Sequence, residues 1–347
     1  CCDWVRNGIN RQAIVIASDI AKYELNSTGE YTQGAGSVSM LICEDPSIIS
    51  FNGSWGVSTK GIGDFFKPRR IFKKSNILIE AAKLLGKEVS SNEAEILLDK
   101  TDSKFWSDSN DLIEVYKEEP IFEGQFSNES YKERVYEAIE NFNEQNQRDI
   151  LSEWENIIFH LPYAYHGRRM IVNKWMDWMK ENNQFDKIYS EIGKPDSSED
   201  KDWIKKVSKS DIYKSFIEDK ISPGEKASSE IGNMYTASIF MSLISSLVEA
   251  FEKDRELINK KIGFISYGSG SKAKIFEGTI QKDWITKTKP IKLFENLDNR
   301  KKVSVDIYEK LHKRKISSNI NNNDGIIKLS KISKDEFTEG LRNYIKY

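Results

Sequence analysis

A chain of 347 residues, with 38% hydrophobic and 31% charged residues, is long enough to bury more than one hydrophobic core. Its 52 Lys and Arg residues nearly balance its 54 Asp and Glu residues, so the formal net charge is -2. No overall positive field attracts nucleic acid or an anionic membrane, and no uncharged apolar run reaches the roughly 18 residues of a membrane span. We expect neither nucleic acid nor a membrane as a partner.

The cysteine content indicates a reducing compartment. Only Cys1, Cys2 and Cys43 are present, which is too few for a disulfide framework. The first residues also lack the basic and then apolar layout of a secretory signal peptide. We therefore expect a cytoplasmic protein.

The first half of the chain predicts two strands followed by charged helices. Short buried strands are expected at residues 13–19 ("AIVIASD") and 34–42 ("GAGSVSMLI"). Residues 23–33 between them are rich in turn formers and are typical of a loop. Residues 76–100 have a charged helical pattern, and residues 129–149 predict a helix with a polar face.

The second half predicts further strands and longer helices. A strand at 155–163 runs into a bend marked by proline, and a strand, glycine turn and strand follow at 260–280. Residues 168–183 predict a helix, and residues 233–254 predict a long helix that is nearly wholly buried. The first of these helices has apolar groups spaced for one face: Ile171, Trp175, Trp178 and Met179. This mixture predicts a layered α/β or α+β fold.

His160 is the clearest candidate for chemistry. It stands at the end of a predicted buried strand, and Pro162 bends the chain just after it. Imidazole titrates near neutral pH, which suits general acid–base work or a hydrogen bond to a substrate carbonyl. A histidine satisfied by a core hydrogen bond is an equally good interpretation. His166 and His312 are expected to be ordinary surface residues.

Two glycine-containing stretches could approach a ligand. In residues 266–271 ("SYGSGS"), backbone N–H groups could reach a ligand oxygen because glycine has no Cβ. Their order differs from the nucleophile elbow of hydrolases, so a structural turn is favoured. Residues 27–36 ("STGEYTQGAG") lack the spacing of the phosphate-binding motifs and are interpreted as a loop that leads into a strand.

Seven blocks along the chain together resemble 3-hydroxy-3-methylglutaryl-CoA synthase of the bacterial type, in the thiolase superfamily. They occur in one order, from about residue 3 to near the C-terminus: "ASDIAKYELNSTGEYTQGAGSVSMLI", "GDFFKP", "EEPIFEGQFSNESY", "IIFHLPYAYHGRRM", "IGNMYTASIFMSLISSL", "IGFISYGSGS" and "LDNRKKVSVDIYEKL". The resemblance implies an α/β thiolase-like fold, layered α-β-α-β-α, and a homodimer. Residues 1–71 would be the remainder of the N-terminal thiolase half, 72–117 a helical insertion, and 118–347 the C-terminal half.

The resemblance also implies the reaction. The family condenses acetyl-CoA with acetoacetyl-CoA in the mevalonate pathway of isoprenoid biosynthesis. A cysteine is acetylated, a glutamate removes an α-proton, the enolate attacks the ketone of acetoacetyl-CoA, and water releases the product. Coenzyme A thioesters are the substrates, and no other cofactor and no metal are implied.

Three residues fall on the family's central polar groups. His160 matches the active-site histidine that holds and polarises the acetoacetyl group. Asn233 matches the asparagine that hydrogen-bonds the thioester, and Ser269 matches a serine of the same pocket. Fixed donors of these types suit a thioester oxygen that gains negative charge.

Four further residues match substrate-binding positions of the family. Thr32 and Ser127 match contacts to the CoA substrate, and Asp19 matches an aspartate close to the reaction centre. Arg169 stands where a lysine normally meets the CoA phosphates, which preserves the charge but changes the geometry.

The chain departs from the family pattern at three places. A second family lysine is Tyr165 here, and the tyrosine of the usual Tyr-Asp-Phe block is Gly63. Cys1 and Cys2 lie about half as far before the first strand as the family's nucleophilic cysteine, a displacement of about 15 Å along a helix. We expect the pair to serve packing, with the nucleophilic cysteine and the catalytic glutamate upstream of residue 1. The chain then corresponds to about the C-terminal two-thirds of the enzyme, and it could not be acylated alone.

Two alternatives remain open. The first is a homologue that adds an acetate unit to a carrier-protein-bound ketide, for which Tyr165 in place of lysine would fit. The second is a non-catalytic thiolase-fold scaffold that binds a partner through the insertion. His160, Asn233 and Ser269 argue against a scaffold, because a scaffold has no need of three such polar groups in one pocket.

Overall fold

The computed structural model describes residues 1–103, 106, 111–117, 119–196, 201–316, 327–335 and 337–346. The chain forms two compact units, Cys1–Phe294 and Glu295–Tyr347. The second unit contains most of α13 (Leu293–Asp298), α14 (Val305–His312) and the antiparallel pair β11 (Ile327–Ile332) and β12 (Arg342–Lys346). All sequence-predicted site residues lie in the first unit.

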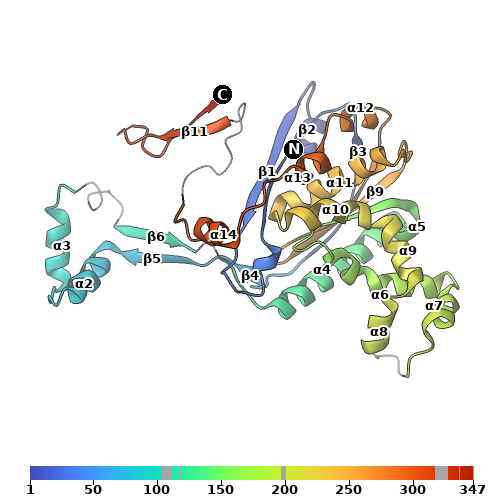
Figure 1. The fold of residues 1–347 in the computed structure, drawn as a ribbon, viewed down its shortest axis with the longest axis horizontal. Helices are drawn as coiled ribbons and strands as arrows, with labels where there is room; N and C mark the ends of the chain where they lie inside the picture. Colours follow the sequence, from blue (N-terminus) through green and yellow to red (C-terminus); the bar gives the residue numbers. More distant parts are fainter. Residues whose placement is uncertain are drawn as a thin grey trace. The chain divides into compact units, whose positions relative to one another are not determined.

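The first unit mixes strands and helices along its whole length (Figure 1). Its strands are β1 (Ala13–Ala21), β2 (Gly34–Ile42), β3 (Ile49–Thr59), β4 (Phe65–Phe66), β5 (Arg69–Lys73), β6 (Leu112–Tyr116), β7 (Ile121–Phe122), β8 (Trp154–Phe159), β9 (Lys261–Gly268) and β10 (Lys272–Ile280). Its helices are α1 (Cys2–Arg6), α2 (Lys74–Leu84), α3 (Ser91–Asp99), α4 (Gly124–Asn146), α5 (Ile150–Glu153), α6 (His166–Glu181), α7 (Phe185–Ile192), α8 (Lys201–Val207), α9 (Asp211–Lys220), α10 (Ser222–Ile231), α11 (Ser238–Glu252) and α12 (Trp284–Thr288). Two short 3₁₀ turns, η1 (Glu30–Thr32) and η2 (Tyr235–Ala237), complete it.

A four-stranded sheet in the order β3-β10-β9-β8 forms the centre of this unit. β10 pairs antiparallel with both neighbours, whereas β8 runs parallel to β9. Successive side chains of a strand point to opposite faces. Ile157 and Phe159 of β8 accordingly join one buried cluster, and Ile158 between them joins another.

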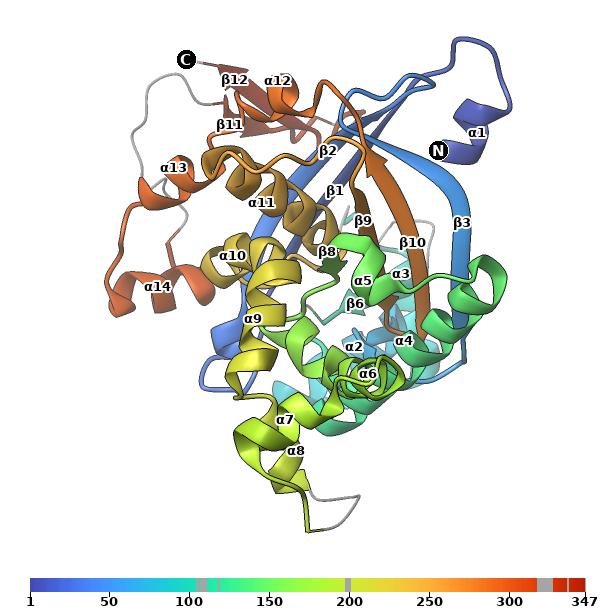
Figure 2. The same cartoon turned by 90° about the vertical axis from the view of Figure 1, so that its right-hand side faces the viewer.

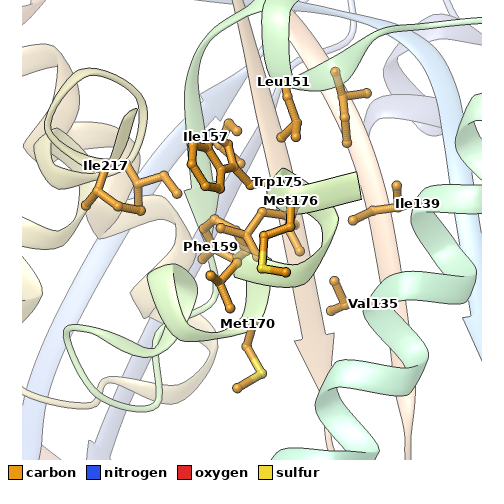
Figure 3. Close-up of a cluster of buried hydrophobic side chains, with 14 of the residues drawn as sticks. Val135, Ile139, Leu151, Ile157, Phe159, Met170, Trp175, Met176 and Ile217 are labelled. Atoms are coloured by element: carbon orange, nitrogen blue, oxygen red, sulfur yellow. The ribbon is translucent and has the colours of Figure 1, made fainter. Parts of the chain in front are cut away.

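Helices α4 and α6 contribute many side chains to the first cluster, part of which Figure 3 shows around β8. Val135 and Ile139 of α4 approach from one side, and Met170 and Trp175 of α6 approach from another. The predicted apolar face of α6 is confirmed, because Ile171, Trp175 and Met179 are all buried. This packing holds the end of β8, where His160 follows, between rigid elements.

The second cluster lies on the opposite face of the sheet, against α11. Leu243 and Leu247 of α11 pack there with Phe264 of β9. Helix α11 contacts α10 along its length, and both helices also touch β2 and β8 (Figure 2). The layers therefore follow in the order β1–β2 sheet, α10 with α11, four-stranded sheet, and α4 with α6. This order agrees with the layered α/β architecture that the sequence predicts.

Strands β1 and β2 form where predicted, but the prediction that they are buried is wrong. Ile14, Ile16 and Ile20 are 70%, 66% and 66% exposed, while Ala17 and Ala21 on the other face are buried. Among the described residues the two strands pair only with each other, and one face alone packs on the helices. The apolar residues of β1 therefore lie on both faces of the ribbon, one packed on the helices and one exposed.

Residues 72–117 hold α2, α3 and β6. β6 pairs antiparallel with β5, and Figure 1 shows α2 and α3 at the far end of this ribbon. Ser90 and Glu93 form a capping box that starts α3. The division into 1–71, 72–117 and 118–347 stays a prediction. No helix in the described ranges is long and apolar enough to cross a bilayer.

Candidate active site

His160 is held by its backbone and by one ring nitrogen. Its N–H donates to the carbonyl of Ile265 on β9 at 2.9 Å, and its own carbonyl accepts from the Tyr131 hydroxyl at 3.0 Å. The ring nitrogen Nδ1 lies 2.8 Å from Oγ of Ser238, the first residue of α11. The imidazole therefore bridges the end of the sheet and the start of a buried helix.

The second ring nitrogen of His160 is open to a ligand. Nε2 has no hydrogen-bond partner in the described part of the chain, yet it is not among the buried polar atoms that lack one, so it reaches solvent. Burial lowers the pKa of His160 to about 4. The ring is therefore neutral at pH 7, and it can form a hydrogen bond with a substrate oxygen while it remains uncharged.

Asn233 is 2% exposed and is fixed from three sides. Its backbone N–H donates to the carbonyl of Thr32 at 2.9 Å, so the structure brings these two predicted residues together. Its side-chain Oδ1 accepts from the Tyr235 N–H at 2.8 Å, and Nδ2 donates to the Tyr23 hydroxyl at 3.3 Å. The Thr32 hydroxyl donates to the carbonyl of Gly29 at 2.7 Å. Both side chains thus already have protein partners.

Asp19 lies near the same segment. Its Oδ1 accepts the neighbouring Ile20 N–H at 2.9 Å. Burial, then the nearby Tyr23, and then the carboxylate of Asp19 raise the pKa of Tyr235 above its ordinary value. The segment from Asn233 through η2 to Ser238 therefore passes close to Asp19 before it reaches His160.

Asp64 connects Ser127 with the glycine turn that carries Ser269. The Asp64 carboxylate is buried, accepts the Gly270 N–H at 2.9 Å, and accepts a hydrogen bond from the Tyr267 hydroxyl. The backbone carbonyl of Asp64 accepts from Ser127 Oγ at 2.6 Å. Ser269 itself is exposed on the turn between β9 and β10.

An aromatic pair links the Ser269 turn to His160. The rings of Tyr131 and Tyr267 lie 4.6 Å apart between centroids, and Tyr131 also bonds the His160 carbonyl. In the described chain, the side chains of His160, Asn233 and Ser269 make no direct hydrogen bond to one another. Tyr131 and Tyr267 link His160 to the Ser269 turn, and the short segment that ends at Ser238 links Asn233 to His160. The meeting of the three side chains around a thioester stays a prediction.

Arg169 stands apart from this network, exposed on the first turn of α6. Its guanidinium lies 5.7 Å from the ring of Tyr163, which belongs to the bend after His160. Tyr165 is 52% exposed, and its ring lies 4.6 Å from the guanidinium of Arg168. An exposed cation beside this bend is accessible to a phosphate group.

His166 is not a surface residue, so that prediction is wrong. Only 1% of it is exposed, because it begins α6 on the helix face that packs inward. Its ring lies 4.3 Å from that of Tyr131 and 4.8 Å from that of Tyr163, and neither ring nitrogen has a hydrogen-bond partner among the described residues. Burial, and then the charges of His160 and Arg169, lower the pKa of His166 to about 3. His312, on α14, is partly exposed.

Replacing His166 by leucine is expected to raise the free energy of unfolding by about 1–3 kcal/mol, because two buried polar atoms without partners disappear. The gain should grow below pH 6.5, since the pKa is about 3 in the folded chain and 6.5 when unperturbed. The wild type then loses stability as pH falls through this window, by up to about 1.4 kcal/mol per pH unit. Urea unfolding at pH 7 and pH 5 measures this, with His312→Gln as the control. A variant that is less stable than the wild type at both values would contradict it.

Several supporting residues were missing from the sequence prediction, among them Tyr23, Asp64 and Ser238. Tyr23 and Asp64 stand inside the blocks "AKYELNSTGE" and "GDFFKP", which could have drawn attention to them. Ser238 stands inside the block "IGNMYTASIFMSLISSL", where it is a polar residue at the start of an apolar helix. Its role depends on a partner 78 positions away in the chain.

The cysteines contribute nothing to this network. Cys1 is exposed, which contradicts the expectation that it serves packing, whereas Cys2 and Cys43 are partly exposed. In α1, Val5 is the buried residue. Within the ranges that the structure describes, no group of three His, Cys, Asp or Glu side chains could hold a metal ion.

The layered architecture is shared with known synthases. The chain is similar to the structure of MvaS in complex with 3-hydroxy-3-methylglutaryl coenzyme A, with a TM-score of 0.66 and 21% identity over 97% of this chain and 67% of that one. It is also similar to the HMG synthase of the curacin biosynthetic pathway, with a TM-score of 0.67 and 16% identity over 99% and 69% of the two chains. These likenesses confirm the thiolase-like α/β fold.

The sequence comparisons identify the family. Residues 111–336 match the model of the hydroxymethylglutaryl-coenzyme A synthase C-terminal domain, which is more than half of the chain. The hydroxymethylglutaryl-CoA synthase of Haloferax volcanii is 26% identical over 323 residues, covering 89% of this chain. The chain spans 62% of that relative's length. It belongs to the hydroxymethylglutaryl-CoA synthase family.

Proposed function

We propose that this chain forms the acetoacetyl-CoA side of a 3-hydroxy-3-methylglutaryl-CoA synthase, an acyltransferase of the mevalonate pathway. The observation that supports this best is the setting of His160. One ring nitrogen is fixed on Ser238, five residues after Asn233, and the other has no partner in the described chain and is not fully buried. The proposal includes coenzyme A thioesters as the only ligands, a cytoplasmic location and a homodimer.

In the proposed reaction, an acetyl enolate attacks the ketone of acetoacetyl-CoA, and negative charge develops on the ketone oxygen. His160 Nε2 donates a hydrogen bond to that oxygen, which stabilises the charge because the donor is already oriented. Asn233 Nδ2 has two hydrogens, and one of them is donated to the Tyr23 hydroxyl. The second hydrogen and the Ser269 hydroxyl donate hydrogen bonds to the thioester. Arg169 binds the CoA phosphates.

The remaining predicted residues position these groups. Thr32 holds the backbone of Asn233, Ser127 holds Asp64 behind the Ser269 turn, and Asp19 lies beside Tyr235. The acyl-carrying cysteine and the proton-abstracting glutamate are proposed to come from outside these 347 residues. Cys1 and Cys2, on a short helix before β1, would not carry the acyl group.

The binding of acetoacetyl-CoA to the 347-residue chain tests the proposal. His160→Gln is expected to raise Kd about tenfold, the equivalent of one lost hydrogen bond. His312→Gln on α14 is the matched control and should bind as the wild type does. Titration calorimetry measures both. Equal affinity of His160→Gln and wild type would contradict the proposal, and so would covalent label on Cys1 or Cys2 after incubation with labelled acetyl-CoA.

A second candidate keeps the fold and changes the acyl carrier. Tyr165 is exposed where the family has a lysine, which fits a pantetheine presented by a carrier protein better than free CoA. A structure similar to this chain, at TM-score 0.59 and 18% identity, is the curacin pathway HMG synthase in complex with acetyl donor-ACP. Tighter binding of an acetoacetyl-carrier protein than of acetoacetyl-CoA would favour this candidate. Failure to bind either ligand would favour a non-catalytic scaffold.

A further inference from the structure

We propose that Ser238 is a positioning residue that fixes the imidazole of His160 as its Nε2–H tautomer, so that a hydrogen-bond donor faces the acyl substrate. The identity of the substrate rests on the proposed function. The tautomer itself rests only on the contacts around the ring.

The Ser238 hydroxyl has one proton to donate and two lone pairs. Ser238 is fully buried at the start of α11. Its Oγ accepts the backbone N–H of Leu161 at 3.3 Å, which occupies one lone pair. His160 Nδ1, at 2.8 Å, is the other partner of this oxygen.

The two possible tautomers leave different groups unsatisfied. If Nδ1 carried the proton, it would donate to Oγ, and the buried hydroxyl proton of Ser238 would have no acceptor in the described structure. If Nδ1 carries a lone pair, the hydroxyl donates to it and every buried group is paired. A buried donor without a partner is costly, so the second arrangement should be favoured about tenfold or more.

The tautomer of His160 decides whether Nε2 is a hydrogen-bond donor or an acceptor toward a ligand. A neutral imidazole has one donor and one acceptor nitrogen, and fixing Nδ1 as acceptor leaves Nε2–H as the donor. The opposite tautomer would present a lone pair to an oxygen that gains negative charge. The backbone of His160 is held independently by Tyr131 and Ile265, so the removal of the Ser238 hydroxyl should release the tautomer without moving the residue.

The chain has three histidines, which makes the tautomer directly measurable by NMR. In protein labelled with ¹⁵N-histidine, long-range ¹H–¹⁵N correlations at pH 7 distinguish the two tautomers of each ring. His160→Gln and His166→Leu assign the signals. We expect wild-type His160 to be mainly the Nε2–H form, Ser238→Ala to give a mixture of both forms, and Ser238→Thr to restore the wild-type pattern.

Ser242→Ala is the matched control. Ser242 is buried one turn further along α11, and its hydroxyl has no hydrogen-bond partner in the ranges that the structure describes, so this variant should leave the His160 signals unchanged. A wild-type spectrum dominated by the Nδ1–H form would overturn the proposal. Unchanged signals in folded Ser238→Ala would do the same. The wild-type spectrum decides the question even where Ser238→Ala fails to fold.

Ligand binding separates this inference from the proposed function. Ser238→Ala should weaken acetoacetyl-CoA binding about fivefold to tenfold, and Ser242→Ala should not. A changed tautomer with unchanged affinity would overturn the role of Ser238 in presenting a donor to the substrate. If His160→Gln also binds normally, the proposed function fails, while the NMR spectra still determine which tautomer the ring adopts.

Discussion

Replacing Arg168 by methionine is expected to lower the free energy of unfolding by about 3–5 kcal/mol at pH 7, because it leaves a buried carboxylate without its cation. Glu225 is 2% exposed, and burial raises its pKa even though Arg168 opposes the rise. Arg168 Nε donates to both Glu225 oxygens, at 3.2 and 3.0 Å, and Nη2 donates to Oε2. The pair joins α6, which follows His160, to α10, which leads to Asn233.

Urea unfolding followed by tryptophan fluorescence measures this loss. The loss should shrink at pH 5, because a carboxyl group with a raised pKa takes up a proton as pH falls and then needs no cation. Adding Glu225→Leu to Arg168→Met should recover most of the stability. Lys205→Met removes an exposed pair with Asp202 and should cost no more than about 0.5 kcal/mol. Equal costs for Arg168→Met and Lys205→Met would contradict the importance of the buried pair.

Gly232→Ala is expected to destabilise the chain by roughly 3 kcal/mol or more and to abolish measurable acetoacetyl-CoA binding. Gly232 has φ +85 and ψ -161, a conformation that is essentially restricted to glycine. A Cβ there would lie 2.0 Å from the carbonyl oxygen of Gln33 and 3.1 Å from that of Thr32. The two backbones would have to separate, which costs packing energy as well as strain. The hydrogen bond from Asn233 to Thr32 would break.

Gly193→Ala provides the matched control for this clash. Gly193 also follows a helix in nearly the same conformation, with φ 80 and ψ 171, but no atom of the residues that the structure describes lies within 4 Å of its added Cβ. Gly193→Ala should lose only the stability that the backbone strain costs, about 1–3 kcal/mol, and it should still bind acetoacetyl-CoA. If the two variants lose equal stability and bind equally well, the close approach of the two segments is not what positions Asn233.

Local patterns predicted the elements that carry the site. The sequence correctly places the apolar face of α6 and the strand before His160. A helix or strand that buries one face has apolar residues at regular intervals, and this spacing can be read from the sequence. The sequence predicts no element in residues 185–231, yet they form α7 to α10 around a few buried side chains such as Trp203 and Tyr213. Short charged helices of this kind are stabilised by tertiary packing more than by their own pattern.

Long-range partners account for what could not be predicted. β3 pairs with β10 more than 200 residues later, and the partner of His160, Ser238, lies 78 positions further along the chain. The burial of His166 depends on Tyr131 of another helix, which no local pattern reports. The local pattern already made His160 a candidate, and the family resemblance added the other site residues. Their supporting partners are visible only in the structure.

The open face of the β1–β2 ribbon carries no charge along its length. Ile14 stands opposite Leu41, Ile16 opposite Ser39, and Ile20 opposite Ala35. Natural proteins keep sheets from sticking to one another largely by placing charged side chains on them. At the concentrations reached in an overexpressing cell, this uncharged face with its exposed isoleucines should therefore drive self-association, and whatever shields it will set the yield of dispersed protein.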